Sequence, residues 1–507
     1  MPAPSKDPES PDTTSFAWDA MIDLWDMIET LLGGTAAMRA AGPLYLPQHD
    51  EESNDNYNER LMTNILTNKM EQTLDNFVGR PFSEPVRFEE GAPDNIVELA
   101  ENIDLQGNNM TVFCRQWFRE GLAKGFAHVL IDFPRMDDEE RGTRTLADDM
   151  AEGRRPYWVL VKPENVIFAA SDIVETEQGV QEFLTHVRIK EVVTERVGFT
   201  EVAHEQIRVL EPGFFQLWRK VVAKGKRKPE WRIIDQGETG LPFVPLTTFY
   251  SDRSGLMTAK PPLEDLAHMN IRHWQSTSDQ INVLTVARFP MLAVAGATDS
   301  SGAVMRIGPR QLLGTKDPNG KFYYVEHGGK SIEAGRVDLQ DLEDQMGTYG
   351  AAFLKRKSGD QTATARALDS AESVTPLQDM TLRFIDTVNN ALSITAAWLN
   401  QPDGGRVMIT TEFGPEELND VDAKTLTQAR QKRDISREAF IKELKRRGII
   451  DEEYDTKADF AVMLKELAES EPLLPFQVPP GVFDPSEDGA DSSDDNKDKK
   501  EETNSAA

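Results

Sequence analysis

The stretch Leu263–Arg288, LEDLAHMNIRHWQSTSDQINVLTVAR, decides how the rest of the chain can be organised. Its apolar residues recur every three or four positions, which is the spacing of one face of an α-helix. Pro261 and Pro262 precede the stretch, and Phe289-Pro290 ends it. The sequence therefore predicts one long helix, roughly 40 Å in length at about 1.5 Å per residue.

The residues after this helix predict a small β insert followed by two more helices. Residues 291–335 are rich in glycine and contain two strand candidates, Met291–Ala295 and Phe322–Val325. Helical spacing returns with Leu339, Leu342, Met346, Tyr349 and Phe353. A short polar loop then leads to a helix predicted over 363–399, in which Pro376 should produce a kink.

The residues before the long helix predict one α+β unit over 16–260. Amphipathic patterns closed by glycine or proline indicate helices over 16–32, 57–77 and 113–124. Runs rich in β-branched and aromatic residues predict antiparallel sheet, and they lie at 127–132, 157–161, 166–169, 183–189, 207–210, 214–222 and 231–234.

The two ends of the chain differ from the middle in composition. Residues 1–15 are rich in proline, serine and aspartate, which predicts disorder and does not fit a signal peptide. Residues 416–475 predict further helices, with Ser436 as an N-cap. From Asp484 to Ala507 there are nine acidic and three basic residues, so 476–507 is expected to be a disordered tail.

Charge restricts the classes of partner. The formal net charge of the 507 residues is −30, whereas proteins that grip nucleic acid by neutralising phosphates are usually basic. Two interpretations stay open: an acidic, solubilising surface, or a wall past which DNA slides without sticking. No stretch approaches the roughly 18 apolar residues that span a bilayer, so no membrane role is expected.

Motifs for catalysis or metal binding are weak. His327-Gly328-Gly329-Lys330-Ser331 resembles the end of a P-loop, but Tyr324 replaces the required glycine and Gly335 is expected to interrupt a following helix. His268 and His273 are five apart, which does not suit two ligands on one helical face. The single cysteine, Cys114, excludes an internal disulfide. We therefore expect no enzyme activity, no metal and no cofactor.

Two basic clusters stand out in this acidic chain. Lys224, Lys226, Arg227 and Lys228 form one, and Lys355, Arg356 and Lys357 form the other. In one subunit each is ordinarily a solvated turn or helix end. Only a ring of subunits would multiply them into a strong field.

An ordered series of short motifs resembles a family of portal proteins of tailed bacteriophages that was formerly labelled as a domain of unknown function. The series covers roughly residues 45–400, and its members are Tyr45-Leu46-Pro47, Tyr57-x-x-Arg60-Leu61, Gly79-Arg80-Pro81-Phe82, Ile103-Asp104-Leu105-Gln106-Gly107, Val129-Leu130-Ile131-Asp132-x-Pro134, Arg155-Pro156-Tyr157, Pro163-Glu164-Asn165-Val166-Ile167, Leu241-Pro242-x-Val244-Pro245, Lys260-Pro261-Pro262-Leu263, Phe289-Pro290-Met291-Leu292, Gly308-Pro309, Gln345-Met346-Gly347 and Thr362-Ala363-Thr364-Ala365. Each motif is short, and their order makes the resemblance specific.

The resemblance implies a ring, usually a dodecamer, at one vertex of the capsid. It implies an α+β portal fold whose parts are a wing (16–260), a stem helix (261–289), a small β clip (290–336), a second stem helix (337–354), a tunnel loop (355–362), a long kinked wing helix with its return (363–415) and a helical crown (416–475). It implies a particle that is assembled in the host cytoplasm and then resides in the virion.

The resemblance also implies partners and site residues. The channel would pass double-stranded DNA during packaging and ejection, and the ring would bind terminase, a head–tail adaptor and the major capsid or scaffolding protein. Candidates for contact with DNA are Lys355, Arg356, Lys357, Ser358, Gln361 and Thr362. Apolar stem faces would be packed seams through Leu266, Trp274, Ile281, Leu284, Leu342, Met346 and Phe353. The alternatives are another phage ring component of the tail or baseplate, or an enzyme such as a nuclease or motor subunit.

Overall fold

The structure is a computed structural model, and it falls into two units, Met1–Phe413 and Gly414–Ala507. It describes residues 10–134, 153–176, 179–222, 229–288, 291–295, 319–325, 329–352, 375–411 and 413 of the first unit, and 427–428, 430–432, 435–446, 459, 462 and 465 of the second. The described residues form helices and antiparallel sheets, which confirms the predicted α+β class.

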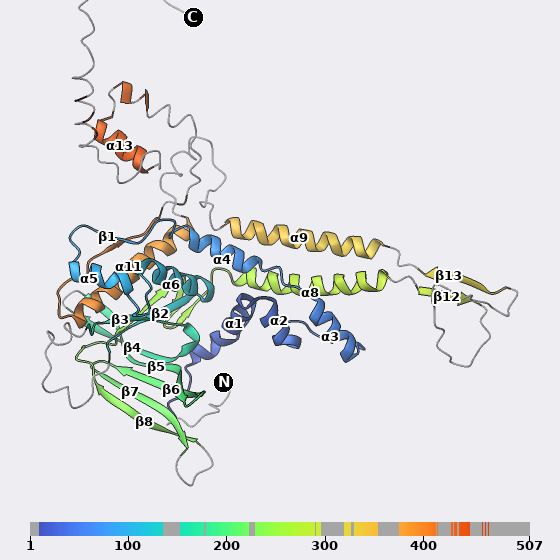
Figure 1. Ribbon diagram of the computed structural model, residues 1–507, viewed down its shortest axis with the longest axis horizontal. Helices are drawn as coiled ribbons and strands as arrows, with labels where there is room; N and C mark the ends of the chain where they lie inside the picture. The colour runs from blue at the N-terminus through green and yellow to red at the C-terminus, as the bar shows by residue number, and fades with distance from the viewer. Residues whose placement is uncertain are drawn as a thin grey trace, which may run out of the picture. The chain divides into compact units, whose positions relative to one another are not determined.

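The described helices of the first unit are α1 (Phe16–Leu32), α2 (Gly34–Ala41), α3 (Asn54–Thr63), α4 (Lys69–Gly79), α5 (Asp94–Leu99), α6 (Met110–Lys124), α8 (Glu264–Ala287), α9 (Lys330–Ala352) and α11 (Pro376–Trp398). Along the first unit, helices α1 to α6 precede most of the strands and helices α8, α9 and α11 follow them; α8 and α9 lie side by side in space (Figure 1). Short 3₁₀ turns lie at Gly42–Leu44, Ala100–Asn102 and Pro163–Asn165.

Within the described residues, the strands form five antiparallel sheets. Their bounds are β1 (Arg87–Phe88), β2 (Phe126–Asp132), β3 (Tyr157–Val161), β4 (Val166–Thr176), β5 (Gly179–Val197), β6 (Thr200–Glu211), β7 (Phe214–Val222), β8 (Pro229–Glu238), β9 (Leu246–Tyr250), β10 (Arg253–Gly255), β11 (Thr258–Ala259), β12 (Met291–Ala295), β13 (Lys321–Val325) and β14 (Val407–Met408). The sheets pair β1 with β14, β10 with β11 and β12 with β13, and the larger ones have the orders β3-β2-β9 and β4-β5-β6-β7-β8.

The predicted helix over 57–77 is wrong, because two helices occupy this region. α3 ends at Thr63, where Asn64 takes up an extended conformation as its C-cap. α4 starts after Asn68, whose side chain accepts a hydrogen bond from the backbone N–H of Glu71. Asparagine bonds readily to nearby backbone groups, so it favours helix ends over helix interiors.

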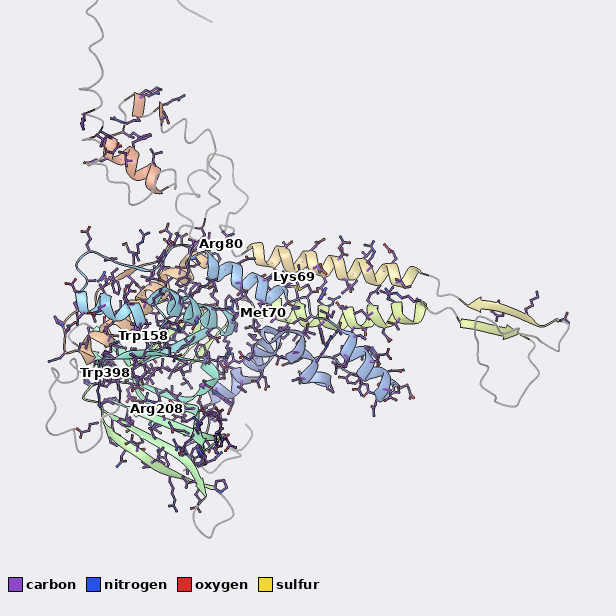
Figure 2. The ribbon with its side chains drawn as sticks, viewed as in Figure 1. Lys69, Met70, Arg80, Trp158, Arg208 and Trp398 are labelled. Carbon is purple, nitrogen blue, oxygen red and sulfur yellow. The ribbon has the colours of Figure 1, made fainter. Side chains whose placement is uncertain are left out.

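The main core lies between the sheet β3-β2-β9 and the helices α6 and α11. Four aromatic rings pack together there with centroids 5.0–5.4 Å apart: Phe384 lies edge to face against Trp117, Phe118 and Phe249, and Phe118 stacks on Phe249. Two tryptophans fix the C-terminal part of α11 to this sheet: the indole N–H of Trp158 donates to Thr395 and that of Trp398 to the carbonyl of Ile131 (Figure 2). Gly121 of α6 lies against the Phe249 ring, where a Cβ would be 2.3 Å from the ring.

The five-stranded sheet attaches to this core through Arg208 of β6. Its guanidinium binds Asp132 of β2 at 2.8 Å and Glu191 of β5 at 2.7 Å (Figure 2). Apolar residues of the same sheet, Val187, Ile189 and Leu210, pack with residues of β2, β9 and β11. The predicted strands of this region are all present, and β4, β5 and β6 run longer than predicted.

The long helix predicted from Leu263 is confirmed as α8, and an antiparallel partner, α9, follows the predicted strands β12 and β13. α9 begins at Lys330, seven residues before the expected start at 337. Gly335 was expected to break helical structure, but it lies inside α9. A Cβ there would meet the terminal amide oxygen of Gln280 of α8 at 2.1 Å, so the absence of a side chain leaves room for this amide in its present position.

The expected kink at Pro376 is also wrong within the described residues. Thr375 is extended and caps α11 by accepting a hydrogen bond from the N–H of Gln378, and Pro376 is the first residue of the helix. Proline suits this position because its missing N–H has no partner in the first turn. Residues 353–374, which include the predicted start of this helix, lie outside the described residues.

The second unit is described chiefly around one helix, α13 (Arg437–Arg446). Ser436 caps it as predicted, since its hydroxyl accepts a hydrogen bond from the N–H of Ala439. Most of the predicted helix over 457–468 and all of the acidic tail lie outside the described residues.

Candidate functional site: the α8–α9 helix pair

The helix pair, defined here as α8 and α9, is fixed to the rest of the first unit through buried polar side chains. Asn270 of α8 accepts a hydrogen bond from the N–H of Met70 and donates one to the carbonyl of Thr67. Asn64 donates to the carbonyl of Trp274. Both asparagines are fully buried, so these bonds fix the position of α8 against the start of α4 and the end of α3.

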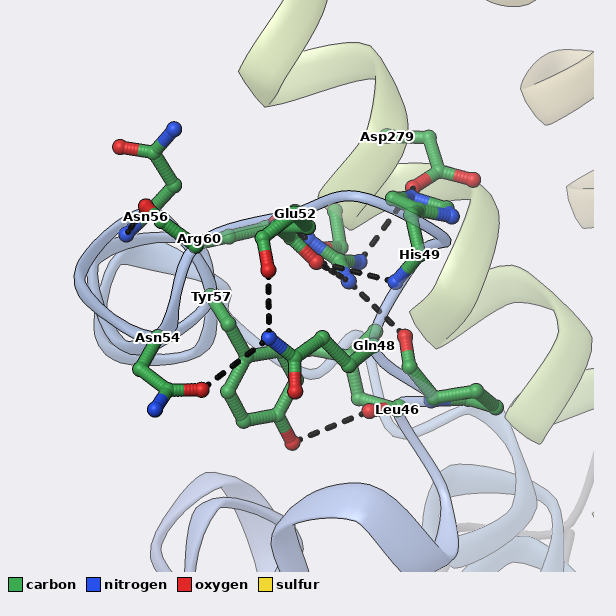
Figure 3. Close-up of polar contacts among 12 residues, drawn as sticks. Leu46, Gln48, His49, Glu52, Asn54, Asn56, Tyr57, Arg60 and Asp279 are labelled. Carbon is green, nitrogen blue, oxygen red and sulfur yellow. Dashed lines mark hydrogen bonds and ion pairs between the residues drawn. The ribbon is translucent and has the colours of Figure 1, made fainter.

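Arg60 of α3 forms the densest polar contact with α8 (Figure 3). Its guanidinium binds both carboxylate oxygens of Glu52 at 2.9 Å, and the two side chains are only 2% and 8% exposed. The same guanidinium donates to the carbonyl of Pro47 and approaches Asp279 of α8 at 3.4 Å. Bidentate geometry makes this a strong and directional pair, and the hydrogen bond from Arg60 lowers the pKa of Glu52.

His49 completes this contact on the solvent side. Its Nε2 lies 3.0 Å from the carboxylate of Asp279, and both side chains are about half exposed. The loop from Leu46 to Glu52 thus lies along α8, where the Tyr57 hydroxyl donates to the carbonyl of Leu46 (Figure 3).

Polar pairs along the whole length of the helices fix the register of α8 against α9. His273 lies 3.2 Å from Glu343, Arg272 lies 3.5 Å from Asp338, and Gln280 donates to the carbonyl of Ile332. At the other end the Tyr349 hydroxyl lies 3.2 Å from Asp265. Burial, with the adjacent carboxylate of Asp265, raises the pKa of Tyr349 to about 12.

The apolar residues expected in the stem divide into two groups along the helices. Leu266, Trp274, Leu342 and Met346 are 0–3% exposed and belong to the main core of the unit. Ile281 and Leu284, nearer the β12–β13 end of α8, stay partly exposed, as do Ile332 and Leu339 of α9. Phe353 lies outside the described residues.

α9 contains more acidic than basic residues, and two of the acids are exposed without an ion-pair partner among the described residues. The helix contains Glu333, Asp338, Asp341, Glu343 and Asp344 against two basic residues, Lys330 and Arg336. Glu333 pairs with Arg336 in the same helix. Asp341 and Asp344 are exposed and make no ion pair with another described residue, so their charge is open to solvent or to a neighbouring molecule.

The predicted DNA-contacting residues Lys355, Arg356, Lys357, Ser358, Gln361 and Thr362 all lie outside the described residues, as does the basic turn 224–228. In the glycine-rich segment His327–Ser331, a helix does begin at Lys330, which corrects the expectation that none follows. Tyr324, which replaces the P-loop glycine, pairs with Leu292 in the β12–β13 hairpin.

Several structurally important charges had no distinctive signal in the sequence. Lys124 was expected only as the end of a helix, yet it is fully buried and binds Glu29, Glu120 and Glu164 at 2.7–3.3 Å. Burial alone would raise the pKa of Glu29, but hydrogen bonds from Lys124 and Lys162 outweigh it and lower the pKa to about 2. Arg60 entered the sequence argument only as part of a motif, because its partners lie 8 and 219 residues away.

The described residues contain neither a metal centre nor a membrane-spanning helix. No group of three or more histidine, cysteine or acidic side chains among them is arranged to hold a metal ion. No helix of that part of the chain is long and apolar enough to cross a bilayer.

Comparison with known proteins gives one family match. Residues 262–399 match the model of a family described as "Domain of unknown function (DUF4055)". The matched segment holds the helix pair and α11. The match confirms there the resemblance to a family that carries the label of a domain of unknown function. No curated protein matches the sequence significantly.

Solved structures of gene transfer agent (GTA) particles are similar at a low level. A chain in the neck of an empty particle, computed with C6 symmetry, has a TM-score of 0.36 and 11% identity, with 71% of this chain and 84% of that chain covered. A chain in the neck of a native particle, computed with C12 symmetry, has a TM-score of 0.36 and 10% identity, with 73% of this chain and 86% of that chain covered. A chain in the virion of the native particle has a TM-score of 0.35 and 11% identity, with 85% of this chain and 98% of that chain covered.

Proposed function

We propose that this chain is the portal subunit of a tailed bacteriophage, which forms a ring at one capsid vertex through which DNA is packaged and ejected. The observation that carries the proposal is the helix pair. Two antiparallel helices of 24 and 23 residues bracket a β hairpin, and the apolar residues nearest that hairpin remain partly exposed. The ordered motifs of the portal family run through this same segment.

Ring formation accounts for the exposed apolar residues. Ile281, Leu284 and Leu339 lie where neither the main core nor the opposite helix covers them fully. Apolar surface is stabilised when it leaves water, by about 25 cal/mol per Å². Repeated copies of the pair, packed side by side, would cover these residues with the equivalent faces of their neighbours.

The exposed acidic residues of α9 would then define the wall of a channel. In a ring of about twelve copies, Asp341 and Asp344 would each form a ring of about twelve negative charges. Such rings repel the phosphates of DNA and limit adhesion while it moves.

A portal subunit would need no catalytic residues of its own, and we propose that this chain has no ATPase activity. ATP turnover by the purified protein that disappears in the Lys330→Ala variant would contradict this.

Electron microscopy of the purified full-length protein tests the proposal. We expect closed rings with a central hole wide enough for duplex DNA. A ring with a hole too narrow for DNA would favour a tail or baseplate component. A protein that stays monomeric at high concentration would contradict the ring altogether.

A further inference from the structure

The flap, defined here as residues 172–176 of β4 and 179–183 of β5, is a two-stranded ribbon at one end of the five-stranded sheet. β4 and β5 pair with each other along these residues. β6 pairs with β5 only from Val187 onward, so it gives the flap no support. A two-stranded ribbon without further packing is marginally stable in water.

A β-bulge lies at the base of the flap. The register shifts between Ala170 and Ser171, because β5 contains one extra residue, Thr185, opposite this step. A bulge bends its strand and changes which side chains face the core. It accounts for the fact that Leu184 and Val187, three positions apart, pack in the same apolar cluster. The strand therefore has a built-in bend where the flap begins.

The flap makes little apolar contact with the rest of the first unit. Ile173, Val174 and Val180 are 74%, 45% and 68% exposed. None of the described residues of the flap belongs to an apolar cluster of the unit. Segments with few buried apolar contacts open locally at lower cost than the core.

A groove of about 530 Å³ separates the flap from the core on its inner side. Residues 181–183 of the flap line one side of it, and β9 and the C-terminal half of α11 line the other. Packed protein interiors contain few spaces of this size. The inner side of the flap therefore lacks the close packing that would fix its position.

An ion pair joins the flap to β10 across this groove. Glu182 of the flap lies 2.6 Å from Arg253, and their side chains are 37% and 46% exposed. The Arg253 guanidinium also lies over the Tyr250 ring, 5.1 Å from its centroid. An ion pair with this exposure is weak and is screened by salt, so it can separate without unfolding of the unit.

We propose that the flap is a gate over the groove, which opens by bending at the Thr185 bulge when the Glu182–Arg253 pair separates. The closed position is the one seen in the structure. Opening exposes the groove wall, in which Val244 and Thr247 are now 4% and 3% exposed. The gate does not require a ring, so it goes beyond the proposed function and is tested independently of it.

A distance measurement between two spin labels tests the gate in the full-length protein. Val180→Cys carries one label on the flap, and Ser393→Cys carries the other on the α11 side of the groove; both positions are exposed. The native Cys114 is fully buried, so it should stay unlabelled. We expect a shorter distance from the closed flap and a longer one from the open flap. The fraction with the longer distance should rise at least about threefold from low to high salt.

A substitution with a matched control provides the second measurement. Arg253→Gln removes the ion pair and should raise the longer-distance fraction at least about threefold at low salt, with the unfolding temperature unchanged. Lys220→Gln is the control, since Lys220 binds Glu205 at 2.6 Å and lies 4.9 Å from the centroid of the Trp231 ring. All three control residues belong to the five-stranded sheet, so this change should leave the distances as they are.

Thiol labelling reports on the groove itself. Val244→Cys places a thiol on the buried groove wall. Its rate of reaction with a small thiol reagent should rise by the same factor when Arg253→Gln is added. Addition of Lys220→Gln should leave the rate unchanged.

The outcomes decide the inference without reference to rings. A single short distance in every variant and at every salt concentration would overturn the gate. A lower unfolding temperature of Arg253→Gln with unchanged distances would also overturn it, because the ion pair would then only stabilise the fold. If Arg253→Gln does not fold, the salt series on the labelled protein decides alone. The portal proposal stands or falls separately, on the formation of rings.

Discussion

Three ionisable side chains are buried in this acidic protein, and each is either paired with carboxylates or held neutral. Arg60 and Lys124 are surrounded by carboxylates, and His128 is held neutral. Removing one member of such a buried pair leaves the other charge without compensation, which costs more than the pair contributed. Effects on stability should therefore be larger at these residues than at the many exposed ion pairs.

Arg60→Ala should destabilise the first unit by about 3–5 kcal/mol, because it leaves the nearly buried carboxylate of Glu52 charged and without its guanidinium partner. Urea unfolding of the purified protein measures the change. Arg336→Ala is the matched control, since Arg336 binds Glu333 with both side chains about 60% exposed and the pair is screened by solvent; it should leave stability nearly unchanged. Equal effects of the two variants would contradict the role assigned to Arg60.

His128 should make the protein sensitive to acid. Burial lowers its pKa from 6.5 to about 3, and its Nδ1 lies 2.8 Å from the Thr248 hydroxyl. Between these two pH values the unfolded chain binds a proton that the folded chain does not, so stability falls as pH decreases from 6.5 toward 3, by up to about 1.4 kcal/mol per unit. His128→Gln should remove this contribution, and unfolding curves at pH 7 and pH 5 should then lie closer together than those of the unchanged protein.

At the scale of elements, the helix pair combines a buried half and a partly exposed half. The buried half contributes to the core of the unit, and the other half presents Ile281 and Leu284. A substitution in the exposed half should therefore affect assembly more than folding.

Ile281→Asp should prevent stable rings, because it would place an unpaired charge in an apolar seam at a cost of several kcal/mol. Asn282→Asp adds the same charge on the exposed side of α8 and serves as the control. Electron microscopy measures ring formation, and the unfolding temperature of the dissociated subunit checks the fold. Stable rings of Ile281→Asp would show that the helix seam is misassigned.

The loop predicted at 356–362 would bring cations into the channel. In a ring of about twelve, Lys355, Arg356 and Lys357 would provide roughly three dozen positive charges, a belt that holds phosphates weakly and more weakly as salt rises. Changing all three to serine in the phage should reduce DNA packaging or retention.

The control for this loop changes Lys226, Arg227 and Lys228 to serine, which removes the same charge elsewhere. Normal packaging and retention of the loop variant across a range of salt would reject contact with DNA. Intersubunit ion pairs of these cations would be the alternative explanation.

At the scale of the whole molecule, charge and apolar surface are distributed unevenly along the chain. The first unit holds the large apolar clusters, whereas 476–507 has little apolar surface to offset the entropy of ordering it. Truncation after Pro475 should therefore leave the unfolding temperature of the first unit and the formation of rings unchanged. Calorimetry and electron microscopy of the truncated protein measure both, and loss of rings would assign the tail a role in assembly.

The sequence by itself determined the elements whose signals are local. α8, α6, β2 and the strands of the five-stranded sheet follow from periodicity and from glycine or proline at their ends. The order of α8, the β12–β13 pair and α9 also follows from the sequence, because each of these segments has its own helical or strand-like pattern of residues. The sequence failed where a short-range signal was misjudged: asparagines divided the predicted helix over 57–77, Pro376 started a helix, and Gly335 lay within one.

Only the tertiary structure decided which residues are covered and which remain exposed. Ile281 has the same helical spacing as Leu266, but it lies beyond the reach of the core that buries Leu266. The sequence predicts Lys124 as a solvated helix end, yet the carboxylates of Glu29, Glu120 and Glu164 surround it. Burial and charge compensation arise from contacts between residues far apart in the chain, and periodicity carries no information about such contacts.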